Sequence, residues 1–554
     1  MGRAGDGSTL NLDFTAMGGT LDPRITFSRP SNATFISSSG YVEWAAANQM
    51  TYSQAQDNNS FWNAFGTNVV RTSAQTDPDG GTNAVKLVFT ATAADAVISR
   101  TVAINNGLPY TISMWMRADS GTVTNVRFGR GATAAGAFFP TLTTTWQRVS
   151  LSFTSNGTND GIEIRVLNSG SPQTATFHVY GAQLEPGSSV RAYQPAVGAT
   201  AFYAPRFDFI PTTLAAKGLL LEAPATNICT YSQDLRNAVW QPDNSGGSAP
   251  VPYTVSEIAP DGSPTSTRYT FNKTGGVFSR LRNPLAATAS TTYTLSVWLK
   301  AYTASGGASV QNVGLRLGAD SVGFNCVVTT TWQRFQYSYT LSGTTADAAV
   351  MLWDNIIGND ETADVLIWGA QIELGTQATS YIPTGAATVS RSVDTAIIAA
   401  GSNFSSWYTG ATSGTFVANW YGSASSTTAR SVIATSDQTT KHLHMYQTAS
   451  ALTLRLADFG AAATVTTANN LTANALTKGA FSYAGTATSL CLNGGTVATG
   501  TLAFTVAPTW LSIGGPSTNG TSITATDVML NNSIRTLKYF PARLSDGQIQ
   551  GLTT

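Results

Sequence analysis

An internal duplication is the feature that most constrains the fold of this 554-residue chain. The strings "VYGAQLEPGSSVRAYQP" (179–195) and "IWGAQIELGTQATSYIP" (367–383) close two long repeats. Four further blocks match in the same order: 51–62 with 230–240, 77–90 with 259–271, 110–118 with 293–301, and 143–154 with 329–340. Because the order is kept, we interpret the two stretches as copies of one domain whose loops have diverged.

Both copies are built from alternating segments that are typical of β-strands. In "YTISMWMRA", Tyr110, Ile112, Met114 and Met116 fall on one face, and polar residues alternate with them. Clusters of Gly, Pro, Asn and Asp separate such segments. Charged residues are only 11% of the chain, against about 25% in typical soluble domains. We therefore predict an all-β chain of tandem antiparallel β-sandwiches (jelly rolls) with an extended N-terminal arm.

The repeats and the turn-rich stretches divide the chain into five parts. We predict an N-terminal arm over 1–50, a first jelly roll over 51–197, a connector over 198–229, a second jelly roll over 230–388, and a different sandwich over 400–554. The prolines of the connector favour a stiff segment docked on a neighbour. Near the end, "LSDGQIQGLT" predicts a short helix capped by Ser545 and Gln548 and ended by Gly551.

Charge and cysteine content exclude several classes of protein. Thirty basic residues balance thirty acidic ones without any basic run, so nucleic-acid binding is not expected. Three distant cysteines exclude a disulfide framework and a clustered cysteine metal site. The start "MGRAGDGSTLNLDF" lacks the apolar run of a signal peptide, and no stretch is apolar enough to cross a membrane. We expect a protein made in a cytoplasm and not inserted in a membrane.

No segment carries the signature of a catalytic centre. HExxH, GxSxG and Walker-type strings are missing from the sequence, so we predict no enzymatic activity, no catalytic residues and no cofactor. His442 and His444 in "KHLHM" are interpreted as part of a surface strand rather than as metal ligands.

The carboxylates crowd into "WDNIIGNDETAD", which is interpreted as an acidic loop between strands. A structural calcium ion held by this loop is the alternative, and glycosidic cleavage by two of its carboxylates is a more distant one. The four carboxylates are Asp354, Asp360, Glu361 and Asp364.

Aromatic residues are the candidates for carbohydrate contacts. Two tryptophan pairs recur in both copies, Trp115 with Trp298 and Trp146 with Trp332, as a structural framework would require. The repeated Arg148 and Arg334 are interpreted as salt-bridge or cation–π partners. Aromatics without a repeat partner are better candidates for ligand contacts. They are Trp407, Tyr408, Trp420 and Tyr421 in the last domain.

The two closing phrases favour a structural role. A strand is predicted to end at Tyr180 or Trp368, where the following Gly permits a bulge. Glu185 and Glu373 recur, and we expect their carboxylates to accept backbone hydrogen bonds where the chain leaves each module.

Three stretches carry a resemblance to a known family. "LDPRITFSRPSNATFISSSG", "PRFDF…KGLLLEAPATNICTYSQDLRNAVW" and "WGAQIELGTQATSYIPT" resemble segments of tailed-bacteriophage virion proteins, where they flank a jelly roll similar to carbohydrate-binding modules. The block with "RTLKYFPARLSDGQIQ" resembles a concanavalin/laminin-G-like sandwich of the same proteins. The first jelly roll, at about 50–197, is an insertion relative to that arrangement.

The resemblance implies a non-enzymatic virion protein, a tail fibre or receptor-binding protein, assembled in the host cytoplasm. A capsid-decoration or head-fibre protein is the alternative, and a glycan-degrading depolymerase fits less well because no long β-helix is visible. A secreted bacterial carbohydrate-binding protein is disfavoured by the missing signal peptide. The expected partners are other virion proteins through the N-terminal arm, further copies of the chain as in a trimer, and a host surface glycan.

Overall fold

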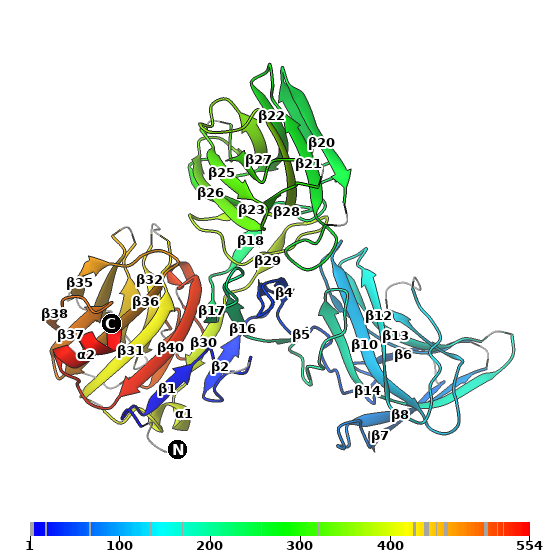
Figure 1. Cartoon of the computed structure of the whole chain (residues 1–554). Helices are drawn as coiled ribbons and strands as arrows, with labels where there is room; N and C mark the ends of the chain where they lie inside the picture. The colour runs from blue at the N-terminus through cyan, green and yellow to red at the C-terminus, as the bar shows by residue number, and fades with distance from the viewer. Residues whose placement is uncertain are drawn as a thin grey trace. The chain divides into compact units, whose positions relative to one another are not determined.

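The computed structural model of the chain consists almost entirely of antiparallel β-sheets (Figure 1). It describes residues 5–16, 19–65, 68–92, 94–131, 136–168, 170–255, 257–304, 306–319, 321–410, 412–424, 428–436, 442–449, 451–458, 464–502, 508–517, 519–524 and 526–554. The chain folds into two compact units. One contains 1–43, 205–383 and 388–554, and the other contains 44–204 and 384–387.

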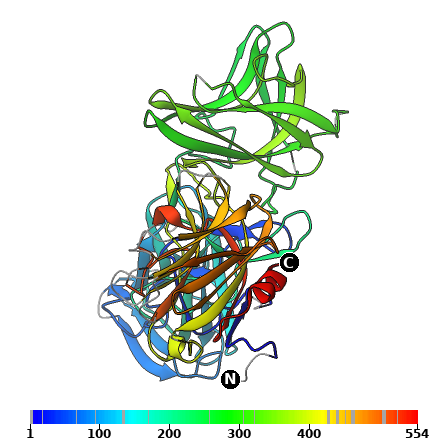
Figure 2. The same cartoon turned by 90° about the vertical axis from the view of Figure 1, so that its left-hand side faces the viewer.

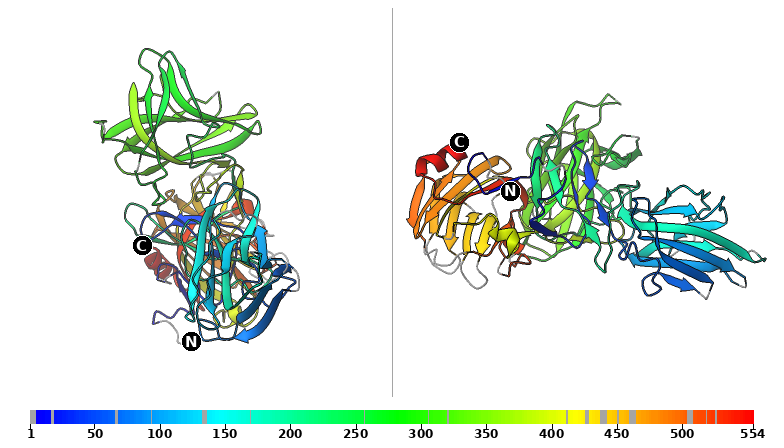
Figure 3. Two further views of the ribbon diagram at one scale, coloured as in Figure 1. Left: turned by 90° about the vertical axis from the view of Figure 1, so that its right-hand side faces the viewer. Right: turned by 90° about the horizontal axis from the view of Figure 1, so that it is seen from below.

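The smaller unit is the first jelly roll, called module 1 below and coloured blue to cyan in Figure 3. One sheet has the strand order β12-β10-β14-β8-β7, and the other has the order β11-β13-β9-β6. The side chains that the alternation predicted to face the core are buried, as Tyr110, Ile112, Met114 and Met116 show. The strands are β6 (Asn63–Phe65), β7 (Val69–Gln75), β8 (Ala84–Ala91), β9 (Ala96–Ala103), β10 (Pro109–Ala118), β11 (Val126–Arg130), β12 (Gln147–Thr154), β13 (Asn159–Val166) and β14 (Gln173–Pro186).

The second copy, module 2, repeats this plan inside the larger unit. Its sheets have the orders β20-β21-β28-β23-β26 and β19-β22-β27-β24-β25. Their inner faces enclose a core with Leu295, Leu315 and Ile367. The strands are β19 (Gln241–Ser245), β20 (Ser248–Thr254), β21 (Thr267–Asn272), β22 (Phe278–Ala286), β23 (Thr291–Ala301), β24 (Val310–Arg316), β25 (Phe324–Thr329), β26 (Gln333–Leu341), β27 (Thr345–Trp353) and β28 (Thr362–Leu374).

The closing phrase of each module contains a β-bulge, as its glycine predicts. The register shifts opposite Gly181 and Gly369, which have φ of 64° and 65°. The strand does not end at Tyr180 or Trp368, because pairing resumes beyond the bulge and β14 and β28 continue to Pro186 and Leu374.

The carboxylates beyond the bulges accept backbone hydrogen bonds from the segment by which the chain leaves each module, as expected. Glu185 accepts a hydrogen bond from the backbone N–H of Arg191 at 3.1 Å, and Glu373 accepts one from that of Thr379 at 2.7 Å. Burial raises the pKa of Glu373.

The C-terminal sandwich recruits strands from distant parts of the chain. β1 (Leu10–Asp13) pairs with β40 (Asn532–Phe540), and β2 (Ile25–Ser28) pairs with β30 (Thr395–Ile398) in the opposite sheet. From the connector, β16 (Arg206–Phe209) and β17 (Ala216–Leu221) extend the sheet of β40. The N-terminal segment is therefore part of the sandwich rather than a free extension.

The remaining strands of the sandwich come from its own segment. They are β31 (Ser413–Tyr421), β32 (Arg430–Ser436), β33 (His442–Gln447), β34 (Thr453–Asp458), β35 (Thr464–Asn470), β36 (Leu476–Ala484), β37 (Ala487–Leu492), β38 (Ala498–Thr501) and β39 (Trp510–Ile513). A short helix, α1 (Ser402–Ser405), precedes them, and a 3-10 turn lies at Thr526–Val528.

The last helix, α2 (Asp546–Thr553), contacts β36 and β37 (Figure 2). Its cap is the predicted one: Ser545 accepts from the Gln548 N–H, and the Gln548 side chain accepts from the Ser545 N–H at 2.8 Å. The helix passes through Gly551 instead of ending there, because Thr553 is buried and its hydroxyl is bonded to the carbonyl oxygen of Ile549. Within the described ranges no helix has the length and apolar character needed to span a membrane.

Two small ribbons complete the larger unit. β3 (Thr34–Ile36) and β4 (Val42–Trp44) form a hairpin, and β18 (Ala225–Asn227) pairs with β29 (Val389–Arg391). In module 1, β5 (Ala47–Asn48) pairs with β15 (Phe202–Tyr203).

Candidate functional site

The two modules share an arginine–tryptophan corner on the sheet that contains the bulge. Trp115 lies opposite Arg148, and Trp298 lies opposite Arg334. Arg148 donates to the Ser113 hydroxyl at 3.0 Å and to the carbonyl oxygen of Arg191 at 2.6 Å. The guanidinium thereby ties the exit segment to the sheet.

The corner in module 2 makes the corresponding contacts. Arg334 donates to the Ser296 hydroxyl at 2.9 Å and to the carbonyl oxygen of Thr379 at 2.7 Å. Its guanidinium lies 4.4 Å from the centre of the Trp298 ring, so the predicted cation–π contact is confirmed here. Trp298 is only 7% exposed, as a framework residue would be.

The next row of module 1 forms what we call the ladder: Arg117, His178 and Lys86 lie side by side on neighbouring strands, and Trp146, directly before β12, extends the row. The register places Arg117 opposite His178 and His178 opposite Lys86. The Arg117 guanidinium lies 5.2 Å from the centre of the partly exposed Trp146 ring. The ladder thus presents an aromatic face beside hydrogen-bond donors.

Asp119 completes the ladder with a carboxylate. It accepts from Lys86 and faces His178 Nε2, each at 2.8 Å. The hydrogen bond from Lys86 lowers the pKa of Asp119, and burial lowers the pKa of His178. At neutral pH the row therefore holds a charged carboxylate, two cations and a neutral imidazole.

Module 2 carries the related row with altered chemistry. Trp332, Lys300 and Arg268 correspond in register to Trp146, Arg117 and Lys86, while Leu366 replaces the histidine. Arg268 forms a bidentate pair with Asp364, both bonds at 2.7 Å, and Lys300 lies 3.1 Å from Glu257. Trp332 and Lys300 of this row line a cleft of about 1020 Å³ inside the larger unit, lined also by the β3–β4 hairpin, the connector and the C-terminal sandwich.

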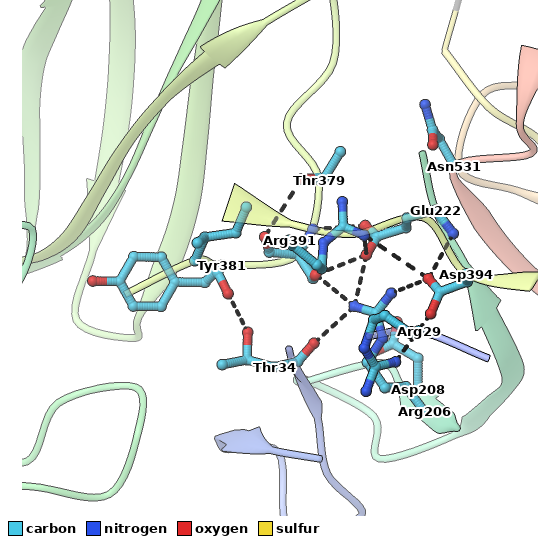
Figure 4. A network of polar contacts seen from close by, with 12 residues as sticks. Arg29, Thr34, Arg206, Asp208, Glu222, Thr379, Tyr381, Arg391, Asp394 and Asn531 are labelled. Carbon is cyan, nitrogen blue, oxygen red and sulfur yellow. Dashed lines mark hydrogen bonds and ion pairs between the residues drawn. The ribbon is translucent and has the colours of Figure 1, made fainter. Parts of the chain in front are cut away.

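Figure 4 shows a buried ion network that includes Glu222, which also lines this cleft. Arg206 and Arg391 pair with Glu222, while Arg206 and Arg29 pair with Asp394. All five side chains are at most 3% exposed. The network joins the N-terminal segment, the connector, the exit from module 2 and the sandwich.

Burial and neighbouring charges shift the pKa values of groups in the network. Burial by itself would raise the pKa of Glu222, but Arg391 and Arg206 hold it at about 2. Burial lowers the pKa of Arg29 to about 10. Sequence reasoning missed this network, although charged residues inside the apolar strings "APRFDF" and "SVDTAII" are a usable signal in so uncharged a chain.

The structure places the predicted aromatic contacts within the C-terminal sandwich. Trp407, Tyr408 and Trp420 are 1%, 9% and 0% exposed and belong to its core. Packing leaves neither face of the two tryptophans open to a sugar. Tyr421, 6% exposed, also lines the cleft. A ligand contact at these positions stays a prediction, and the packing favours it only at Tyr421.

The carboxylates of the acidic loop accept hydrogen bonds from other residues of the protein. Asp354 and Glu361 both accept from Lys273, at 2.7 and 2.6 Å, and Asp360 accepts from the Asn312 N–H at 2.7 Å. Within the part of the chain that the structure describes, no three His, Cys, Asp or Glu side chains lie together as metal ligands would.

The two histidines of "KHLHM" have different outcomes. His444 is 2% exposed rather than on the surface as predicted; its ring lies 4.7 Å from that of Tyr446, on the sheet face opposite the core residues Leu443 and Met445. The side chain of His442 lies outside the described residues.

Both modules are antiparallel β-sandwiches in which one sheet carries a tryptophan beside charged side chains. Residues 47–173 match a family of carbohydrate-binding domains, CBM_4_9. The chain thus contains a carbohydrate-binding-module domain, which coincides with most of module 1. No curated protein matches the chain.

Solved structures with a related fold are distant. The sialidase CBM40 of Ruminococcus gnavus, bound to α2,3 sialyllactose, is 18% identical, with 26% of this chain and 82% of that chain covered and a TM-score of 0.22. The tandem CBM22 domains of Paenibacillus barcinonensis Xyn10C are 12% identical over 60% of this chain and 98% of theirs, with a TM-score of 0.24. Domain 4 of the arabinanase AbnA of Geobacillus stearothermophilus, in complex with arabinotriose, is 12% identical over 32% and 82%, with a TM-score of 0.23. At this level the likenesses do not indicate a ligand.

Proposed function

We propose that this protein binds carbohydrate through the ladder of module 1 and does so as a non-enzymatic component of a tailed-bacteriophage virion. The observation that carries the binding proposal is the ladder itself, whose Trp146, Arg117 and Lys86 lie within the segment that matches carbohydrate-binding domains. A pyranose ring offers C–H groups to an aromatic face and hydroxyls to charged donors and acceptors. Trp146 supplies the face, and Arg117, Lys86 and Asp119 supply the polar partners.

A glycan array followed by calorimetry tests the binding. The full-length protein should bind a defined set of glycans, and Trp146→Ala should raise the Kd about fivefold, since one aromatic contact contributes about 1 kcal/mol. Phe139→Ala is the matched control, because Phe139 is a 49% exposed aromatic of module 1 outside the ladder. Equal affinity of the wild type and Trp146→Ala for every bound glycan would contradict the assignment.

The virion role is supported by the resemblance of the segments around both modules to tailed-phage virion proteins. We propose a tail fibre or receptor-binding protein, with capsid decoration as the alternative. Because β1 and β2 are strands of the sandwich, attachment to the virion would use a folded surface and not a loose arm.

Immunogold electron microscopy of purified particles separates the two positions. Label at the tail supports the tail-fibre role, label on the head supports decoration, and unlabelled particles overturn the virion proposal. Release of reducing sugar from a bound polysaccharide would overturn the non-enzymatic role and favour a depolymerase.

A further inference from the structure

We propose that the cleft of the larger unit is a second binding site, specific for an uncharged oligosaccharide, formed jointly by module 2, the β3–β4 hairpin, the connector and the C-terminal sandwich. Its volume of about 1020 Å³ lies at the upper end of the range of ligand pockets, about 300–1,000 Å³. The site is separate from the ladder of module 1 and does not require that the ladder bind anything.

The cleft is held open by its own contacts. The Val42 N–H donates to the carbonyl oxygen of Pro260 at 2.8 Å, and Val42 packs with Trp298 and Tyr381 in a small apolar cluster. The hairpin is fixed to module 2 by these contacts. A site whose walls are already bonded to one another needs little ordering when a ligand enters.

The hairpin is also bonded to the connector. The Ile36 N–H donates to Asp208 Oδ1 at 2.9 Å. At the turn, Gly40 has φ of 81°, and a Cβ there would lie only 3.0 Å from the carbonyl oxygen of Pro211. The hairpin turn and the connector turn are therefore closely packed, and together they form one wall.

Aromatic and amide side chains line the cleft from different elements. Tyr41 is 43% exposed at the hairpin, and Trp332 is partly exposed on module 2. From the sandwich, Asn474 is exposed and Asn531 is partly exposed. The buried Asn532 donates to Asn474 and to a backbone carbonyl oxygen. An amide side chain both donates and accepts, as a sugar hydroxyl does, so rings and amides together suit the faces and edges of a saccharide.

The charges of the lining cancel. Lys217, Lys300 and Arg334 face Asp208, Glu222 and Glu257 among the lining residues. Lys217 is 2.9 Å from Asp208, and Lys300 is 3.1 Å from Glu257. With the cations neutralised in this way, a charged ligand would gain no net attraction and would lose its hydration. An uncharged ligand is therefore favoured.

The duplication explains how one chain comes to have two different sites. The row Trp332–Lys300 descends from the same ancestral positions as Trp146–Arg117, but here it borders a cleft completed by three other elements. Module 1 keeps the row on its own sheet, beside Asp119. The two copies thus offer a tryptophan beside a cation, Arg117 in one and Lys300 in the other, in different surroundings, from which we infer different ligands.

The test compares the full-length protein with variants on arrays of neutral and acidic oligosaccharides, followed by calorimetry. Tyr41→Ala and Lys300→Gln are the cleft variants. Tyr253→Ala is the control for the first, since Tyr253 is 40% exposed and outside the cleft lining. Lys538→Gln is the control for the second, since Lys538 forms a comparable surface pair with Asp6.

The expected result is a neutral oligosaccharide whose Kd rises about tenfold in each cleft variant and is unchanged in both controls and in Trp146→Ala. Glycan binding that all cleft variants leave intact overturns this inference, even if Trp146→Ala abolishes binding and the proposed function stands. Binding that the cleft variants weaken only for acidic sugars also overturns it. Displacement of the bound sugar by peptides would likewise assign the cleft to a protein segment and overturn the inference.

Discussion

Removal of one carboxylate from the buried ion network should destabilise the larger unit strongly. Asp394 is fully buried, and it binds Arg29 at 3.0 Å, Arg206, and the N–H of Glu222 at 2.9 Å. Three guanidiniums and two carboxylates give the network a formal charge of +1 (3 − 2), and Asp394→Ala raises it to +2. Breaking a buried pair by removing one partner costs about 3–5 kcal/mol, and we expect a loss in this range.

The assay is urea unfolding of the full-length protein, with hydrogen exchange to separate the larger unit from module 1. Asp6→Ala is the control, because its pair with Lys538 is exposed and contributes at most about 1 kcal/mol. Exchange in module 1 should be unchanged. A loss for Asp394→Ala no larger than that for Asp6→Ala would refute the idea that this network holds the unit together.

Three other predictions concern single positions. Arginine partners lower the pKa of Glu222 to about 2, so its contribution is complete above pH 4.5 and is lost as pH falls from there toward 2. A Glu222→Gln variant should show a smaller acid-induced loss of unfolding free energy over that interval. Gly369→Ala should cost about 2–4 kcal/mol in thermal unfolding, since φ is 65° and a Cβ would lie 2.9 Å from Trp298, whereas Gly343→Ala, with open space, should be nearly neutral. Ser545→Ala should lower stability by about 1 kcal/mol and Ser545→Asp should not, as differential scanning calorimetry can show.

Local patterns predicted the parts of the fold that depend on neighbours in the sequence. Alternation identified β10 and its buried face, and the repeated glycine identified the bulges at Gly181 and Gly369. The capping box at Ser545 was visible because it spans four residues. In each case the controlling interaction lies within one strand or one turn, so a short window of sequence contains it.

Interactions between distant segments could not be predicted in that way. Nothing in "LNLD" indicates that β1 pairs with β40, since an edge strand accepts many partners of suitable pattern. The choice of Trp407 and Trp420 as ligand contacts rested on their having no repeat partner, and this property says nothing about burial. The cleft could not be predicted either, because its walls come from four parts of the chain that are distant in sequence: the hairpin, the connector, module 2 and the sandwich.

Module 1 begins and ends at one place. Tyr203 pairs with Ala47, and the Ala204 N–H donates to the carbonyl oxygen of Ala46 at 2.8 Å, so the entering and leaving strands are hydrogen-bonded neighbours. A domain with adjacent ends can be gained, lost or exchanged as a single cassette without stretching the chain that receives it. Recombination at this point would exchange the whole module through two neighbouring junctions, at Ala46–Ala47 and Tyr203–Ala204.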